Sequence, residues 1–319
     1  MTTIRASVRI EQKPWGCTNL QPWSDISTPG RPIGEIWFEH VDCDAPTPAL
    51  LLKLLFTSAP LSIQVHPDDS YAQSIGLACG KTEAWYILQA GADAQIGLGL
   101  KRQITIPALR SAIDDSSIAD LLQWQPAEKD AVYLVPAGTI HSIGAGLVIA
   151  EIQQRSDATF RLFDHGRQRE LHVDHAVAAA DRTPTPRGSH AKRLTESRSL
   201  LTAGPHFVLE RLDLAPNSSW EFHSERESWF LVIAGNGQIE TSGARIGDAF
   251  FIEADRARID VGADGMSGLA AYLGPDVLPD LLSGLQQRDG WQSTGPSAHS
   301  TVQRRSADVQ LRDTAEVPT

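Results

Sequence analysis

The sequence predicts a mainly β protein made of two jelly-roll barrels, each a double-stranded β-helix, with a helical insertion in the first barrel. Three observations lead to this fold class. Short strand-like segments alternate with Gly and Pro clusters along most of the 319 residues, two motifs of the first half return in the second half, and one segment has helical spacing. The length and the 41% hydrophobic content are sufficient for about two domains.

The strand-like segments of the first half are rich in aliphatic and aromatic residues and lie between turn-forming residues. They cover residues 34–40, 49–57, 83–90 and 146–154. Each is short, which is typical of a barrel or sandwich and not of a helical protein.

The stretch "LSIQVHPDD" (61–69) alternates apolar and polar residues up to His66, and Pro67 then stops the pattern. Strict alternation is the period of a β-strand with one buried face. Ser62, Gln64 and His66 therefore lie on the same face of this strand. An amide and an imidazole on one face either meet solvent or reach inward to a shared object.

Two helical segments are predicted. In "IPALRSAIDDSSIADLLQW" (106–124) apolar residues recur at i, i+3 and i+4, and Pro107 suits a first helical turn. This predicts a helical insertion over about 101–126. A second, shorter helix is predicted over 170–182.

An internal repeat supports the two-barrel architecture. "EAWYILQAG" (83–91) resembles "ESWFLVIAG" (227–235), and "DAVYLV" (130–135) resembles "DAFFIE" (248–253). The number of residues between the two members differs from one motif pair to the other by about the length of the helical insertion. This pattern predicts two copies of one β-rich unit, with the insertion in the first copy.

We therefore expect four parts along the chain. They are a catalytic barrel (1–182), a linker (183–195) that contains Pro, Gly and Ser, a second and degenerate barrel (196–285), and a polar tail (286–319) with poor order. In an ungapped alignment Ile259 lies opposite His141, so the second copy lacks one candidate ligand although it has Glu227 and His223. We expect no metal in the second barrel.

The element "PAGTIH" (136–141) fits the pattern Pro-x-Gly-x-x-His. Its Pro and Gly make a turn, and His141 on the next strand can point into a barrel. Strand-rich units with this element are typical of double-sheet jelly rolls of the cupin type.

Four residues form a candidate metal site. Nitrogen and oxygen donors without a thiolate suit one zinc, manganese, iron or similar divalent ion, and the candidates are Gln64, His66, Glu83 and His141. The alternative is that each is a surface or hydrogen-bonded polar group. Their common placement at positions that face the barrel interior favours the metal.

Further polar residues lie around these four in segments that otherwise look buried. Lys81 and Arg161 would make a local anion trap, Glu151 could pair with either, and the hydroxyl of Ser62 could donate to a phosphate. A solvated Lys81 and a surface ion pair of Arg161 are the ordinary alternatives.

The overall charge and the termini exclude several classes. A net charge of −11 should repel nucleic acid and anionic membranes. The three cysteines show no disulfide framework, the N-terminal residues lack an apolar signal region, and no run of 18 apolar residues occurs. We expect a cytoplasmic protein with no membrane and no nucleic-acid partner.

Several of these motifs together resemble a known family. They are "PWG" (14–16), "GEIW" (34–37), "LSIQVHPDD" (61–69), "GKTEAWYIL" (80–88) and the block 136–164, in this order. The chain is similar to class I (type I) mannose-6-phosphate isomerase, or phosphomannose isomerase, in its short bacterial form, a member of the cupin superfamily. The resemblance is close over about 10–180, and the two-cupin layout extends it to about 275.

The resemblance implies a zinc-dependent aldose–ketose isomerase that interconverts mannose 6-phosphate and fructose 6-phosphate through an enediol(ate). It implies that one zinc ion is held by Gln64, His66, Glu83 and His141. It also assigns a catalytic role to Arg161, a place at the sugar-phosphate pocket to Lys81 and Ser62, and active-site positions to Glu151 and Trp15.

The chemistry of the residues agrees with this assignment. A metal can polarise the carbonyl and hydroxyl oxygens, Arg161 can stabilise an oxyanion, and Lys81 stands beside them. Glu151 is the first choice for the general base, with His66 or a metal-bound water behind it.

The expected partner is a small sugar phosphate, and the expected state is a monomer or weak homodimer. Two alternatives stay open: a non-catalytic sugar-phosphate-binding cupin, and an isomerase of another aldose. A metal dioxygenase is disfavoured by the amide ligand Gln64 and by the adjoining cations.

Overall fold

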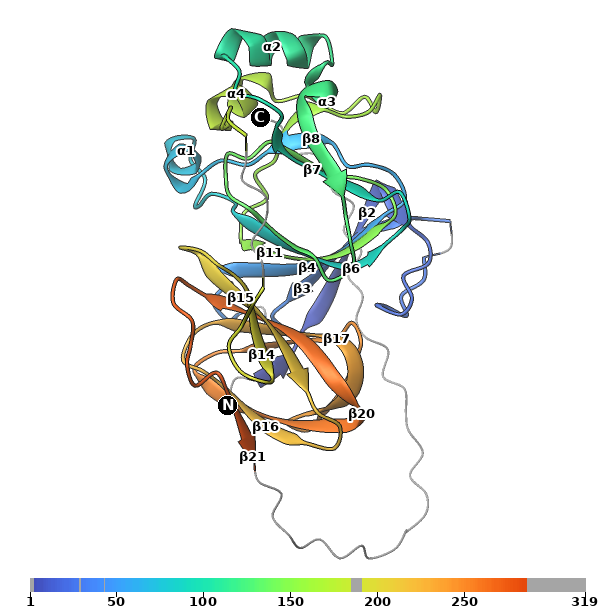
Figure 1. Cartoon of the computed structure of the whole chain (residues 1–319), viewed down its shortest axis with the longest axis vertical. Helices are drawn as coiled ribbons and strands as arrows, with labels where there is room; N and C mark the ends of the chain where they lie inside the picture. The colour runs from blue at the N-terminus through green and yellow to red at the C-terminus, as the bar shows by residue number, and fades with distance from the viewer. Residues whose placement is uncertain (1–2, 29, 43, 185–190, 286–319) are drawn as a thin grey trace, which may run out of the picture.

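The structure is a computed structural model that describes residues 3–28, 30–42, 44–184 and 191–285. The polar tail expected over 286–319 and part of the expected linker lie outside the described residues. The described chain is mainly β, as predicted, and its antiparallel strands build two barrels that lie one above the other in Figure 1. No helix within the described ranges is long and apolar enough to cross a membrane.

The first barrel consists of two facing sheets. One sheet has six strands in the order β2 (Ser7–Cys17), β3 (Ile33–Glu39), β4 (Leu50–Thr57), β11 (Leu147–Gln154), β6 (Glu83–Ala90) and β9 (Val132–Val135). The other has five strands in the order β12 (Phe160–Phe163), β5 (Ile63–Val65), β10 (His141–Ile143), β7 (Gln95–Leu100) and β8 (Leu122–Pro126). The strands predicted over 34–40, 49–57, 83–90 and 146–154 are confirmed as β3, β4, β6 and β11.

Within the described residues, the strands of the second barrel form one ten-stranded sheet. Its strands are β13 (Lys192–Arg193), β14 (Arg198–Ala203), β15 (Phe207–Leu214), β16 (Ser219–Ser224), β17 (Ser228–Ile239), β18 (Ser242–Arg245), β19 (Ala249–Ile252), β20 (Asp255–Leu273), β21 (Leu282–Leu285) and the N-terminal β1 (Thr3–Arg5). Strand β1 pairs with β19, so the first strand of the chain completes the edge of the second barrel. The division of the chain at 182 and 195 stays a prediction.

One apolar cluster lies between the two barrels, and another fills the interior of the second barrel. The largest cluster joins β3, β4, β6 and β11 of the first barrel to β15, β17, β19 and β20 of the second. A separate cluster, built by Phe222, Phe230 and Ile259 among others, fills the second barrel. Burial of this apolar surface is the main force that holds the two barrels together.

Four short helices lie on the first barrel. They are α2 (Ile106–Asp114), α3 (Ile118–Leu121) and α4 (Val173–Ala179) at the top of Figure 1, and α1 (Asp69–Ser74) at its left. The helix predicted over 106–124 is two helices. Ser116 takes a left-handed φ of 66° that ends the first one, and from Leu122 the chain becomes strand β8, paired with β7. Helix α1 was not expected; Asp68 caps it by accepting a hydrogen bond from the Tyr71 amide.

The internal repeat is present in the fold, but the similar residues face opposite ways. Trp85 and Ile87 of β6 point into the first barrel, whereas the matching Trp229 and Leu231 of β17 face the other barrel. The strand pairing is the same in both copies, since Trp85 pairs with Tyr133 and Trp229 pairs with Phe251. Glu227, which the sequence aligns with Glu83, therefore lies at the inter-barrel contact.

Candidate active site

A polar cavity of about 250 Å³ lies in the first barrel, between its two sheets. Two of the site residues predicted from the sequence, His66 and His141, do not line the cavity but lie next to Gln64 and Glu83, which do. The other predicted residues line it: Trp15, Ser62, Gln64, Lys81, Glu83, Glu151 and Arg161. Further charged or polar lining residues are Lys13, Glu35, Lys53, Asp157, Thr159, Arg169 and His172.

Strand register brings the site together from distant parts of the chain. Gln64 of β5 pairs with His141 on one side and with Arg161 on the other. Directly paired residues of antiparallel strands project from the same face, so these three side chains lie in a row. The period-2 pattern of 61–66 then adds Ser62 and His66 to that face, as predicted.

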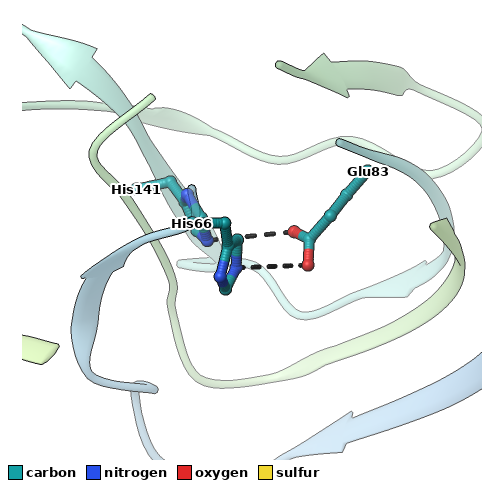
Figure 2. Close-up of side chains that lie close together, drawn as sticks. All are labelled: His66, Glu83 and His141. Atoms are coloured by element: carbon teal, nitrogen blue, oxygen red, sulfur yellow. Dashed lines mark ion pairs between the residues drawn. The ribbon is translucent and has the colours of Figure 1, made fainter. Parts of the chain in front are cut away.

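His66, Glu83 and His141 form a compact, buried cluster, and Figure 2 shows their side chains converging. The Nε2 atom of His66 lies 3.2 Å from Oε1 of Glu83, and the Nε2 atom of His141 lies 3.8 Å from Oε2. The donor atoms of the three residues are all within 4.8 Å of one another.

The surroundings of this cluster fit a divalent metal ion. Nδ1 of His66 lies 2.7 Å from the Ala158 carbonyl, and Nδ1 of His141 lies 2.8 Å from the Thr139 carbonyl. Each Nδ1 must therefore carry the proton and donate it, which leaves both Nε2 lone pairs aimed at the centre. Both oxygens of Glu83 are buried without a hydrogen bond. Two imidazole lone pairs and a carboxylate that face one point suit a divalent cation, although Lys81 Nζ already lies 3.1 Å from Oε1 of Glu83.

Gln64 stands against this cluster. Its amide nitrogen lies 3.3 Å from Nε2 of His141, and its oxygen accepts a hydrogen bond of 3.0 Å from Ser62. To bind a metal, the amide must turn over so that the oxygen faces the imidazoles, since only the oxygen is an acceptor. The hydroxyl of Ser62 orients this amide. The sequence had instead suggested that this hydroxyl donates to a phosphate.

Burial and the neighbouring charges set the protonation states of the cluster. Burial lowers the pKa of His141 to about 3 and also lowers that of His66, so both rings are neutral near pH 7. Burial by itself would raise the pKa of Glu83, but the positive charge of Lys81 is the largest opposing cause and helps to hold that pKa well below its usual range. Two neutral imidazoles and a carboxylate are the protonation states that metal binding requires.

Glu151 lies across the cavity in a second buried network. Its oxygens accept from Lys53 Nζ at 3.3 Å and from Trp85 Nε1 at 3.0 Å, and Lys53 also lies 3.8 Å from Glu35. Burial, together with the charge of Glu83, raises the pKa of Glu151 to about 7. A carboxyl with a pKa near 7 can both take and return a proton at neutral pH.

Lys81 and Arg161 provide positive charge at two levels of the cavity. Lys81 is buried and lies 3.1 Å from Glu83; although burial lowers its pKa, Glu83 and Glu151 outweigh this and raise it to about 12. Arg161 is half-buried and donates through Nη1 to the Glu170 carbonyl at 3.0 Å. Trp15 adds a buried indole to the wall.

The sequence reasoning missed Lys53, Arg169 and His172. A signal for Lys53 existed, because it is the one charged residue in the apolar strand "LLLKLLFT" of β4 and is only 3% exposed. The register then pairs Lys53 directly with Glu151 of β11. Arg169 and His172 follow β12 in a loop that carries no such pattern.

The second barrel has no counterpart of this site among the residues that the structure describes. Among the described residues, the one cluster of side chains that could hold a metal is that of His66, Glu83 and His141, in the first barrel. Ile259 is fully buried in the apolar filling of the second barrel, and Glu227 instead accepts from the amides of Ala49 and Leu50, at 2.6 and 2.7 Å. The absence of a metal from the second barrel stays a prediction.

Comparisons with known proteins give similar sequences of one kind. The chain is 35% identical over 158 residues to "Mannose-6-phosphate isomerase" of Streptococcus mutans, across 46% of this chain and 50% of that protein. It is 32% identical over 247 residues to "Putative mannose-6-phosphate isomerase YvyI" of Bacillus subtilis, across 70% of this chain and 76% of that protein. The match spans about half the length of the first of these relatives. No family model matches the chain.

Solved structures share the fold. The crystal structure of the mannose 6-phosphate isomerase from Bacillus subtilis has a TM-score of 0.74 and 24% identity, and the match covers 85% of this chain and all of that one. A putative mannosephosphate isomerase from Archaeoglobus fulgidus has a TM-score of 0.67 and 16% identity, across 85% of this chain and 97% of that one. At these identities the likeness shows the two-barrel fold and no more.

Proposed function

The chain belongs to the type I mannose-6-phosphate isomerase family, and we propose that it is a metal-dependent aldose–ketose isomerase that interconverts mannose 6-phosphate and fructose 6-phosphate. The observation that carries this proposal is the buried cluster of His66, Glu83 and His141 beside a cavity that Glu151 also lines. A metal site and a carboxyl base in one enclosed space suit a proton transfer between two carbon atoms.

We propose that His66, Glu83, His141 and a reoriented Gln64 hold one divalent ion, and that this ion is zinc. When bound, such an ion supplies Lewis acidity that polarises the carbonyl and hydroxyl oxygens at C1 and C2 of the sugar. Nitrogen and oxygen donors suit zinc, although they also suit manganese and iron, so the metal content needs a direct measurement.

Glu151 is the proposed general base. In the forward direction its carboxylate takes the proton from C2 of mannose 6-phosphate, and the C1 carbonyl oxygen becomes an enediol oxygen. The proton is then returned to C1, while the proton of the C2 hydroxyl passes to the C1 oxygen. The carbonyl has thus moved to C2, with no net gain or loss of atoms. The raised pKa of Glu151 suits both halves of the exchange, and Lys53 at 3.3 Å holds the carboxyl in place.

Lys81 and Arg161 stabilise the charge that develops on the enediolate oxygens. Both line the cavity, and fixed cations in a site that excludes water favour an oxyanion more strongly than water does. Replacing Arg161 by Ala should keep the metal and lower kcat, by about a hundredfold. Full activity of this variant would show that Arg161 has no catalytic role.

A purified sample tests the whole proposal. Metal content is measured, and conversion of mannose 6-phosphate is followed before chelation, after chelation and after zinc is restored. We expect one metal ion per chain and activity that disappears and returns with it. A protein that binds metal but turns over neither mannose 6-phosphate nor free mannose would instead be a binding cupin.

Location in the cytoplasm and a monomeric or weakly dimeric state stay predictions. They are checked by cell fractionation and by light scattering of the purified chain over a range of concentrations.

A further inference from the structure

We propose that Arg169 and His172, in the loop after β12, bind the phosphate group of the substrate at the solvent side of the cavity. This inference rests on the proposed function for the identity of the ligand, a sugar phosphate monoester. It goes beyond that function because it assigns the phosphate to two residues for which the sequence offered no role, and moves it away from Ser62 and Lys81.

The two ends of the cavity differ in how deeply their polar side chains are buried. Ser62 and Lys81 are buried, and their polar atoms are bound to the metal end, at Gln64 and at Glu83. Arg169 and His172 line the same cavity but are half-buried. If C1 and C2 of the sugar lie at the metal end, C6 and its phosphate lie at the other end of the carbon chain, towards solvent.

The proton position of His172 makes this ring a donor. Its Nδ1 atom accepts a hydrogen bond of 3.2 Å from the backbone amide of Arg161. A ring that accepts at Nδ1 must carry its proton at Nε2 when it is neutral. Burial, followed by the charge of Arg161, lowers the pKa of His172, so the neutral ring with an Nε2–H donor is its form near pH 7.

Arg169 is held in place with part of its guanidinium unused. Its Nε and Nη2 atoms donate to the two oxygens of Asp164, at 2.7 and 2.6 Å. Within the described residues its Nη1 group has no hydrogen bond. Arg167 binds the same Asp164, so the cluster of two arginines and one carboxylate keeps a net positive charge. Such an ordered guanidinium suits a phosphate dianion.

The same loop is tied to the proposed catalytic arginine. The His172 amide donates to the Arg161 carbonyl at 2.9 Å, and Arg161 Nη1 donates to the Glu170 carbonyl at 3.0 Å. Binding a phosphate at Arg169 and His172 therefore also fixes the segment against which Arg161 rests. Binding energy from the phosphate can in this way be used at the reacting end of the sugar.

The test uses inorganic phosphate as the probe and three variants of the zinc-loaded chain. Arg169→Ala removes the guanidinium. His172→Asn keeps an acceptor near the Nδ1 position but removes the Nε2–H donor. Arg167→Ala is the matched control, since it removes the same charge from Asp164 but Arg167 does not line the cavity. Phosphate affinity is measured by calorimetry, and KM and kcat are measured with mannose 6-phosphate.

We expect the dissociation constant for phosphate and the KM for mannose 6-phosphate to rise together, by about tenfold to a hundredfold for Arg169→Ala and about tenfold for His172→Asn, with a smaller change in kcat. Arg167→Ala should change both constants less than about threefold. Unchanged constants in both test variants, or an equal effect in Arg167→Ala, would overturn the inference. Phosphate binding that depends on Arg169 in a chain without isomerase activity would support it and reject the proposed function.

Discussion

The two barrels have the same architecture but opposite interiors. The first encloses buried charges and imidazoles around a cavity, whereas the second is filled by apolar side chains such as Phe230 and Ile259. Sequence likeness between the two hides this difference, because Glu83 and Glu227 align and yet face opposite ways. A repeated fold thus surrounds a cavity with polar groups in one copy and is filled by apolar side chains in the other, and the face on which each polar residue lies decides which.

The strongest test of this contrast removes a histidine from each barrel. His141→Ala deletes a proposed ligand, so metal affinity should fall by more than about a hundredfold and activity should be lost with it. His223→Ala changes β16 of the second barrel and should leave metal content at one ion per chain. Metal content measured after dialysis separates the two. Retained metal in His141→Ala would contradict the proposed ligand set.

The pH dependence of the rate gives a second test of the first barrel. Burial and the charge of Glu83 raise the pKa of Glu151 to about 7 in the metal-free chain. A bound cation offsets the charge of Glu83, so in the loaded protein this pKa should lie lower than 7. The base must be ionised, so kcat/KM should fall about tenfold per pH unit below that pKa. A rate that increases on acidification from pH 7 to pH 5 would rule out a carboxylate base.

In the second barrel, a buried ion pair should matter for stability and not for chemistry. Glu210 accepts from Arg198 at 2.8 Å, and both side chains are buried. Glu210→Gln leaves the Arg198 charge without its partner and should lower the free energy of unfolding by about 3 kcal/mol. The surface pair of half-buried Glu221 and exposed Arg256 is the control, and Glu221→Gln should cost less than about 1 kcal/mol. Chemical denaturation measures both, and unchanged kcat at 25 °C is expected.

The smallest expected effect is at the contact between the barrels. Glu227 accepts from the amides of Ala49 and Leu50, next to the start of β4. Glu227→Ala leaves two amides without an acceptor and should cost about 1–3 kcal/mol of unfolding free energy. Exposed Glu225 offers a matched control at almost the same place. A loss no greater than that of Glu225→Ala would mean that the apolar contact alone holds the barrels together.

Local patterns predicted much of the site. The alternation from Leu61 to His66 correctly aimed Ser62, Gln64 and His66 at one face, and the turn before His141 placed that ring beside them. Both inferences depend only on strand period and turn chemistry, which act over a few residues.

The rest depended on contacts between distant segments. Lys53 reaches Glu151 only through the pairing of β4 with β11, and the tautomer of His172 is set by the backbone of Arg161. The sequence also did not show that β6 and the matching β17 turn opposite faces to the interiors of their barrels, which places Glu227 at the contact between the barrels. None of these relations leaves a periodic trace in the sequence.

Proton transfer by Glu151 beside a metal in the first barrel is the central proposal. The most direct measurement is exchange of the C2 hydrogen of mannose 6-phosphate for deuterium in D₂O, followed by NMR, in the zinc-loaded chain and in Glu151→Gln with equal metal content. We predict exchange in the unaltered chain and a rate at least about a hundredfold lower in the variant. Exchange at the same rate in both would contradict the account.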